Sequence, residues 1–162
     1  MLRIDSLETP LGTIHLAARG DALVELNFGA PLEGERARSE AAERLRAYFE
    51  GDVRALDELR VDPAGTPFQK RVWSLLRQIP AGETRSYGEL AELLGSHPRA
   101  VGAANGANPV ALVIPCHRVI AKDGSLCGYA FGEERKRWLI EHERAAAAAW
   151  FAPRRAENSP RP

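Results

Sequence analysis

Residues 2–28 alternate between apolar and polar side chains, with the two-residue period of strands that bury one face. The alternation is broken at residues 9–12 and at Gly20-Asp21, which are sequences that favour turns. The pattern therefore predicts two or three antiparallel strands. Its apolar positions are Leu2, Ile4, Ile14, Leu16, Leu23, Val24, Leu26 and Phe28.

A helix and a connector are predicted next. Ser39 can cap a helix that carries Leu45, Tyr48 and Phe49, and Gly51 would end it. Residues 53–63 show no sustained period, so they predict a connector with one short strand. The Pro-Ala-Gly sequence that begins at residue 63 is a natural boundary, and we place the end of an N-terminal lobe, residues 1–63, there.

Helical periodicity begins after residue 65. Thr66-Pro67 supplies a capping residue and a proline at the first helical position, and apolar residues then recur on one face through Ile79. Ser86 and Glu89 have the spacing of a capping box, which predicts a second, shorter helix that ends at Gly95.

The third helical stretch, residues 99–107, contains almost no large side chains. A helix, a short turn and a second helix form the outline of a helix-turn-helix unit, although many αα-hairpins of this outline bind no nucleic acid. Small residues let a helix backbone approach either a neighbouring helix or the floor of a DNA groove. Arg99, at the start of the stretch, is poorly suited to burial and well suited to entering a base stack.

The remaining chain predicts one strand and one helix. Residues 110–114 form a short apolar run that predicts a strand, and residues 133 to about 147 have helical amphipathicity. These elements complete a mostly helical C-terminal domain, residues 64–148, and give an α+β fold class. Residues 149–162 have the composition of a disordered tail.

The composition is that of a folded globular protein. Of 162 residues, 44% are hydrophobic and 27% are charged, and no apolar run reaches membrane-spanning length. The first residues lack a signal-peptide pattern, so we expect a cytoplasmic protein without membrane contact. Two cysteines cannot build a disulfide framework, and four scattered histidines predict no metal site.

The zero net charge hides an asymmetry between the two halves. Residues 1–63 contain 8 Lys and Arg against 13 Asp and Glu, whereas residues 64–162 contain 14 against 9. Residues 93–122 have no acidic side chain at all, which suits a polyanionic partner such as DNA. A segment of low charge density that is mostly core explains the same numbers equally well.

Cys116 carries the strongest chemical signal, because a histidine and an arginine follow it directly. A nearby imidazole or guanidinium favours the thiolate, the nucleophilic form of cysteine. Strand neighbours point to opposite faces, so pairing with His117 requires a turn at Pro115 or a bridging water. The helix that carries Glu143 offers a carboxylate to orient the imidazole. An isolated cysteine is more often a small buried apolar residue, which suits Cys127.

Five groups of residues occur in order between residues 66 and 143. They are Thr66-Pro67-Phe68-Gln69 with Val72-Trp73; Gly82-Glu83-Thr84-Arg85-Ser86-Tyr87; Arg99-Ala100-Val101-Gly102-Ala103-Ala104-Asn105-Gly106 with Asn108-Pro109; Pro115-Cys116-His117-Arg118-Val119; and Trp138-Leu139 with His142-Glu143. Together they resemble the O6-alkylguanine-DNA alkyltransferases, also called methylated-DNA:protein-cysteine methyltransferases. The first 63 residues match this family only in outline, as its RNase H-like β-sheet lobe.

The resemblance implies a DNA-repair activity. A member of the family flips O6-alkylguanine out of duplex DNA and transfers the alkyl group to its own cysteine; O4-alkylthymine is a further candidate substrate. A flipped base is required because O6 is inaccessible in the stack, at a cost of roughly a few kcal/mol. The resemblance further implies a single turnover, no cofactor and a monomer.

The resemblance also implies roles for individual residues. Cys116 is expected to attack the alkyl carbon, with His117 as its base through a water and Glu143 orienting the imidazole. Tyr87 is expected to contact the flipped base and help protonate the departing guanine. Arg99 is expected to fill the gap in the stack.

Further residues are expected to line the substrate pocket or the DNA surface. Asn108 would brace the turn before the cysteine. The expected substrate-binding residues are Asn108, Val119, Ala130 and Phe131, and the expected DNA-binding residues are Ser86, Arg99, Ala100, Gly102, Ala103 and Asn105.

The chain departs from the family pattern near the pocket rim. Phe131-Gly132 stands where many relatives have two glycines, so bulky O6 adducts such as benzyl should react more slowly than methyl. Ala130 offers only its main-chain amide to O6. The N-terminal lobe has no cysteine, so the structural zinc of some relatives is not expected.

Two other functions compete with alkyl transfer. A lesion-binding protein without transfer is one, although Cys116 argues against it because that group carries tryptophan there. A thiol hydrolase that uses a Cys-His-Glu triad is the other, and the helix-turn-helix outline and the lack of a recognisable oxyanion loop argue against it.

Overall fold

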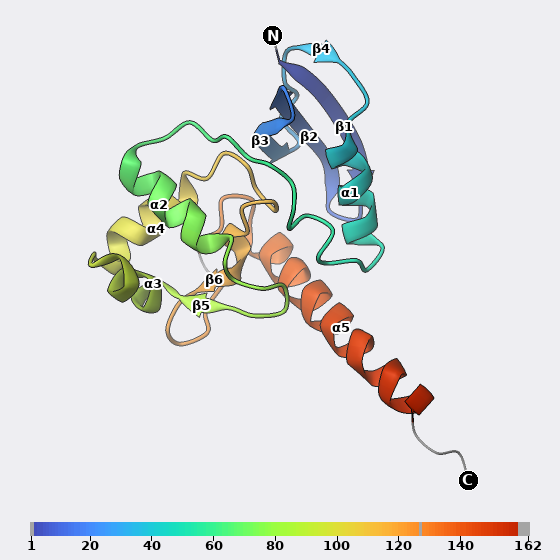
Figure 1. Ribbon diagram of the computed structural model, residues 1–162. Helices are drawn as coiled ribbons and strands as arrows, with labels where there is room; N and C mark the ends of the chain where they lie inside the picture. The colour runs from blue at the N-terminus through green and yellow to red at the C-terminus, as the bar shows by residue number, and fades with distance from the viewer. Residues whose placement is uncertain (1, 127, 159–162) are drawn as a thin grey trace.

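The computed structural model describes residues 2–126 and 128–158, with side chains through residue 149. The N-terminal lobe contains a meander of β1 (Arg3–Thr9), β2 (Gly12–Arg19) and β3 (Ala22–Phe28), as predicted. The two-residue strand β4 (Glu35–Arg36) joins β1 in parallel, which gives the order β3-β2-β1-β4 (Figure 1). The mixed α+β fold class is confirmed.

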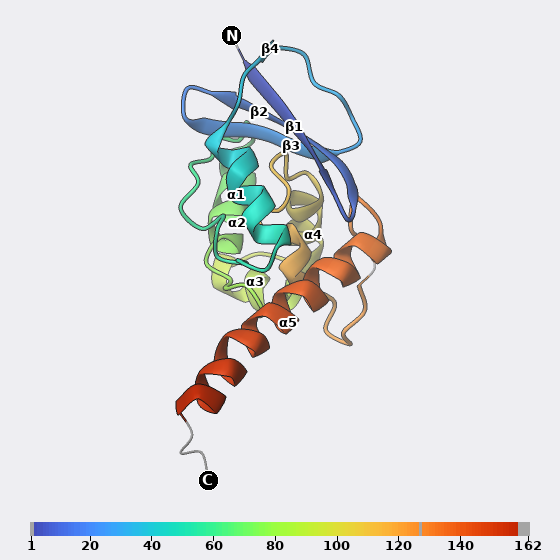
Figure 2. The same ribbon diagram turned by 90° about the vertical axis from the view of Figure 1, so that its right-hand side faces the viewer.

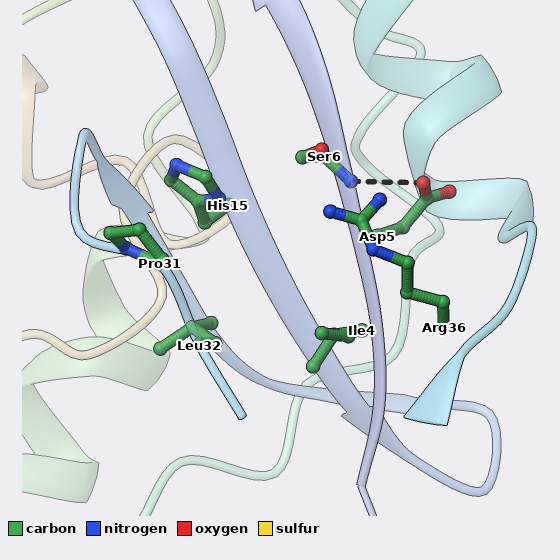
Figure 3. A pocket seen from close by; sticks show the side chains of 7 residues that line it. All are labelled: Ile4, Asp5, Ser6, His15, Pro31, Leu32 and Arg36. Carbon is green, nitrogen blue, oxygen red and sulfur yellow. Dashed lines mark hydrogen bonds between the residues drawn. The ribbon is translucent and has the colours of Figure 1, made fainter. Parts of the chain in front are cut away.

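Strand alternation buries one face of this sheet. Leu7 pairs with Ile14, and both side chains are buried in the core. The neighbouring pair, Ser6 and His15, lies on the other face, where a shallow hollow is lined by polar and apolar side chains (Figure 3). Its lining residues are Ile4, Asp5, Ser6, His15, Pro31, Leu32 and Arg36.

Helix α1 (Glu40–Phe49) is tied to the sheet through its cap. The Ser39 Oγ accepts a hydrogen bond from Ala42 N at 3.1 Å, as the sequence predicts. Asp5 Oδ2 accepts from both the backbone N and the Oγ of Ser39, each at 3.1 Å. The cap therefore fixes the start of α1 against β1.

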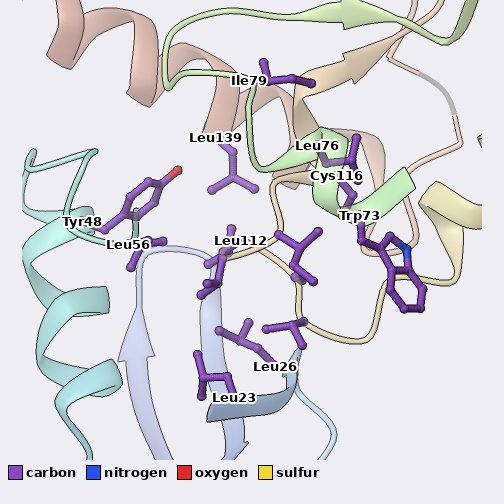
Figure 4. Packing of buried hydrophobic residues seen from close by; sticks show 14 of the residues in the cluster. Leu23, Leu26, Tyr48, Leu56, Trp73, Leu76, Ile79, Leu112, Cys116 and Leu139 are labelled. Atoms are coloured by element: carbon purple, nitrogen blue, oxygen red, sulfur yellow. The ribbon is translucent and has the colours of Figure 1, made fainter. Parts of the chain in front are cut away.

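The outer edge of β3 is covered by two segments from elsewhere in the chain. Leu23 exchanges backbone hydrogen bonds with the segment at residues 60–62, and Leu26 does so with the segment at residues 109–111. The second segment leads into the turn that carries Cys116. The two lobes are thus joined by main-chain hydrogen bonds and share one core (Figure 4).

The prediction of a strand at residues 110–114 is wrong. Val110 makes an isolated bridge with Leu26, and the chain then turns through Leu112, whose φ is +69°. All five residues are buried. An unbroken apolar run reports burial, and it does not distinguish a strand from a buried turn.

The C-terminal domain begins with α2 (Pro67–Leu76), which Thr66 and Gln69 cap reciprocally. Helix α3 (Tyr87–Leu94) has the predicted capping box and ends at Gly95 in the left-handed conformation. Helix α4 (Pro98–Gly106) follows after a turn of three residues, which gives the predicted helix, turn and helix. Trp73 Nε1 donates to the Ala104 carbonyl at 2.8 Å and fixes α4 against α2.

Helix α5 (Glu133–Asn158) is longer than the sequence predicts. Its 26 residues span about 39 Å, and the C-terminal part projects from the body (Figures 1 and 2). Residues 149–158 are therefore helical, whereas the sequence predicts a disordered tail, because the alanine run at residues 145–149 propagates the helix. Residues 159–162 of that predicted tail lie outside the described residues. Within the described chain, none of the helices combines the length and apolarity needed to cross a membrane.

Candidate active site

Cys116 lies in a short 3-10 turn, η1 (Cys116–Arg118), that follows Pro115. The turn ends where the Val119 N–H donates to the Cys116 carbonyl and β6 (Val119–Ile120) begins beside β5 (Arg85–Ser86). The turn at Pro115 is thus present, but it does not join the two side chains directly, because His117 Nδ1 has no hydrogen-bond partner among the described residues. Three consecutive side chains therefore leave the backbone in different directions.

Glu143, on α5, is the centre of a buried hydrogen-bond network. Its Oε2 accepts from Tyr48 Oη at 2.7 Å, from His117 Nε2 at 2.8 Å and from the Arg118 guanidinium at 2.9 Å. Its Oε1 accepts from Arg118 Nε at 2.8 Å. Burial alone would raise the pKa of Glu143, but His117 and Arg118 outweigh it and hold the pKa well below its usual range. Glu143 is therefore ionised.

The imidazole of His117 is fully buried and has a defined tautomer. Because an ionised carboxylate only accepts hydrogen bonds, His117 Nε2 carries the proton and donates it to Glu143. Nδ1 is then an acceptor, and it has no hydrogen-bond partner among the described residues. Burial lowers the pKa of His117 more than Glu143 raises it, so the ring is neutral and ready to take a proton on Nδ1.

Cys116 is a neutral thiol at rest, which corrects the expectation of an ionised one. Only 5% of its surface is exposed, and this burial raises the pKa of the thiol. Asn108, Lys136 and Tyr129 lower the pKa, but less than burial raises it. The expectation failed because the neighbouring Arg118 is committed to Glu143 and to the Ile79 carbonyl, at 2.7 Å, and so does not stabilise a thiolate.

Two asparagines fix the backbone around the cysteine. Asn108 Nδ2 donates to the Ile114 carbonyl at 2.8 Å, and Asn108 Oδ1 accepts from the Val110 N–H at 3.0 Å. Asn108 thus spans the turn before Cys116. Asn105 Nδ2 donates to the Cys116 carbonyl at 3.2 Å.

Asn105 is expected from the sequence to contact DNA, but the structure buries its side chain. It is 4% exposed and lies on the inner face of α4, because it follows the buried Val101 by one helical turn. Ala100 and Ala103 are exposed on the other side of the helix, Gly102 is half-buried, and Arg99 is exposed at the start. Ser86, another residue expected to bind DNA, caps the start of α3, where its Oγ accepts a hydrogen bond from Glu89 N.

Val119 and Lys136 form a second buried contact beside the cysteine. Lys136 is fully buried, and its Nζ donates to the Val119 carbonyl at 2.5 Å. The same ammonium lies 6.0 Å from the centre of the Tyr87 ring. A Cβ on Gly102 would lie 3.8 Å from that ring. The Tyr87 ring therefore lies between α4 and Lys136. Tyr87, Val119 and the turn of Cys116 are therefore brought together.

The loop before α5 approaches the thiol from another side. The hydroxyl of Tyr129 and the thiol of Cys116 are close enough to shift each other's pKa. Ala130 is exposed and Phe131 is half-buried beside Tyr129, at the edge of the site. Cys127, which the sequence predicts as a small buried apolar residue, lies outside the described residues.

Tyr48 and Lys136 are site residues that the sequence did not reveal. Tyr48 could be placed on the buried face of its helix, but its partner lies 95 positions along the chain. Lys136 precedes the buried Leu139 by three positions and Glu143 by seven, which is a signal for a shared helix face. In the described residues, no group of His, Cys, Asp and Glu could hold a metal ion.

Comparisons with known proteins match both lobes. Residues 2–63 match a family model described as 6-O-methylguanine DNA methyltransferase, ribonuclease-like domain, and residues 67–145 match the DNA binding domain of the same name. A Mycobacterium bovis methylated-DNA--protein-cysteine methyltransferase is 43% identical over 160 residues, which cover 92% of this chain and 96% of the relative.

Two further matches are a second curated relative and a crystal structure of a protein bound to DNA. The protein of the same name from Shigella flexneri is 52% identical over 104 residues, and these span 63% of this chain but 61% of the relative. The crystal structure of Mycobacterium tuberculosis OGT in complex with DNA is 39% identical, with a TM-score of 0.78, over 89% of this chain and 94% of that one.

Proposed function

The chain belongs to the O6-methylguanine DNA methyltransferase family, and from this we infer that it repairs DNA by moving an alkyl group from O6 of guanine to Cys116. The observation that carries this proposal is the site itself. A neutral thiol and a neutral imidazole with an available Nδ1 lie in one turn, and an ionised carboxylate fixes the imidazole. DNA is the partner, and we propose that residues 64–148 bind it.

Transfer requires the neutral thiol to lose its proton. The proton of Cys116 passes through a water to Nδ1 of His117, and the positive charge that forms on the ring is stabilised by Glu143 at 2.8 Å. The sulfur attacks the alkyl carbon, the S–C bond forms and the C–O6 bond breaks. The departing guanine takes a proton, which Tyr87 helps to deliver. The product is a thioether, so each molecule reacts once.

The base must leave the duplex to reach this buried sulfur. Arg99 stands exposed at the start of α4, where it can fill the gap left in the stack. The exposed Ala100 and Ala103 let the helix approach a groove closely, which supports binding with little readout of sequence.

Intact-mass measurement tests the proposal. The protein is incubated with excess O6-methylguanine duplex, and a gain of one CH2 unit is expected on the wild type and none on Cys116→Ser. Cys127→Ser is the matched control and should gain the unit. A wild type that binds the duplex without a mass change would indicate a lesion-binding protein instead. Repeated turnover of a soluble ester would indicate a thiol hydrolase.

A further inference from the structure

The loop that edges the active site is attached to the N-terminal lobe by an aromatic chain. Tyr129 lies beside Cys116, and its ring centre is 5.8 Å from that of Phe131. Phe131 in turn meets Phe28, the last residue of β3, edge to face at 5.1 Å. The rim residue Phe131 is therefore held between the loop and the sheet.

Arg135 reinforces this attachment from the first turn of α5. Its Nε donates to the Leu11 carbonyl at 3.0 Å, in the turn between β1 and β2. Its Nη1 donates to the Phe131 carbonyl at 3.1 Å, and its guanidinium lies 5.1 Å from the centre of the Phe28 ring. One side chain thus connects the sheet, the loop and α5.

These contacts determine how freely the Phe131 ring can move. Phe28 is almost fully buried, so it cannot follow Phe131 outward without exposing its own ring. The Phe131 backbone is held through its carbonyl, so the ring has only its side-chain torsions with which to move. Phe131 is one ring contact away from Tyr129, which lies beside Cys116, so we expect a large alkyl group on Cys116 to displace this ring.

We propose that Phe28 and Arg135 are positioning residues for substrate specificity: by holding Phe131 at the rim, the N-terminal lobe limits the size of alkyl group that Cys116 accepts. This inference rests on the proposed function. Neither residue contacts the reacting atoms; each acts through Phe131.

The test is the ratio of transfer rates for benzyl and methyl from duplex O6-alkylguanine. Removing the edge-to-face partner in Phe28→Ala should raise the benzyl-to-methyl ratio about two- to tenfold. Arg135→Met keeps the aliphatic stem and leaves the buried Phe28 ring in place, so it is expected to disturb folding less than Phe28→Ala, and it should raise the ratio in the same direction. Leu23→Ala, at another buried position of the same strand, is the matched control and should leave the ratio unchanged.

A double variant separates action through Phe131 from general loosening. In a Phe131→Ala background, Phe28→Ala should produce no further rise in the ratio. A benzyl-to-methyl ratio that is unchanged in Arg135→Met and in Phe28→Ala would overturn the inference. It would also be overturned if Phe28→Ala raised the ratio as much in the Phe131→Ala background as in the wild type. If Phe28→Ala does not fold, Arg135→Met decides alone. Failure of the wild type to accept methyl would instead overturn the proposed function.

Discussion

Replacing Glu143 by glutamine would remove the charge at the centre of the buried network while preserving its shape. Four donor groups, from Tyr48, His117 and Arg118, now converge on its two oxygens. A glutamine has one acceptor oxygen, and its NH2 group would face donors. At least one donor of the buried Arg118 would lose its acceptor.

The expected destabilisation is large. Removing one partner of a buried ion pair costs about 3–5 kcal/mol, because the other charge remains in the interior without compensation. A domain is typically stable by about 5–15 kcal/mol, so Glu143→Gln should lose a substantial share of its free energy of unfolding. Methyl transfer should also be lost, since the imidazole of His117 is no longer fixed.

The pH dependence identifies the charge as the cause. The pKa of Glu143 is lowered in the folded state, so its stabilisation is complete above the ordinary value of 4.5 and declines as pH falls below it. The glutamine variant lacks this titration. The difference in unfolding free energy between the two proteins should thus be constant above that pH and narrow by up to about 1.4 kcal/mol per pH unit below it.

Urea unfolding of both proteins at a series of pH values from neutral to about pH 3.5 measures this difference. Glu141→Gln, an exposed position on the same helix, is the control and should change stability by less than about 0.5 kcal/mol. A loss below about 1 kcal/mol at neutral pH would refute the ionised network. A difference that stays level into acid would refute it as well.

Three further predictions follow from the placement of single residues. Arg99→Ala should slow transfer from duplex DNA by about ten- to a hundredfold and leave transfer from free O6-benzylguanine base unchanged, because only the duplex requires flipping; equal slowing of both rates contradicts the role. Asn105→Ala should lower the free energy of unfolding by about 1–3 kcal/mol in urea titrations, without weakening duplex binding in a fluorescence assay, because its amide is buried against the Cys116 carbonyl; weaker binding at unchanged stability would restore the DNA-contact interpretation. In a Cys127→Ser background, the rate of iodoacetamide alkylation of Cys116 should have its pH midpoint above the ordinary thiol value of 9.0, since burial raises the pKa; a midpoint below it would show a resting thiolate.

Local signals in the sequence predict the elements well. The caps Ser39, Thr66 and Ser86 each accept the hydrogen bond that their position predicts, so three helix starts are where the pattern places them. Gly95 ends its helix in the left-handed conformation, which is the role that a glycine after the last helical residue predicts. These signals work because the groups that make each bond are only a few residues apart.

Long-range contacts could not be predicted in this way. The hydrogen bond from Tyr48 to Glu143, and the exclusion of Asn105 from the surface, depend on how helices pack. The protonation of Cys116 depends on burial by the whole fold, so its neighbours in sequence suggested the wrong direction. The chemistry was recognisable from the order of motifs, whereas the resting charge of the nucleophile was not.

Helix α5 carries Arg135, Lys136 and Glu143 within little more than two turns, and each of them holds a different part of the site. Each residue of an α-helix advances by about 100° around the axis, so one residue inserted between Lys136 and Glu143 would turn the carboxylate away from His117. Natural variation in chain length should therefore be excluded within this stretch.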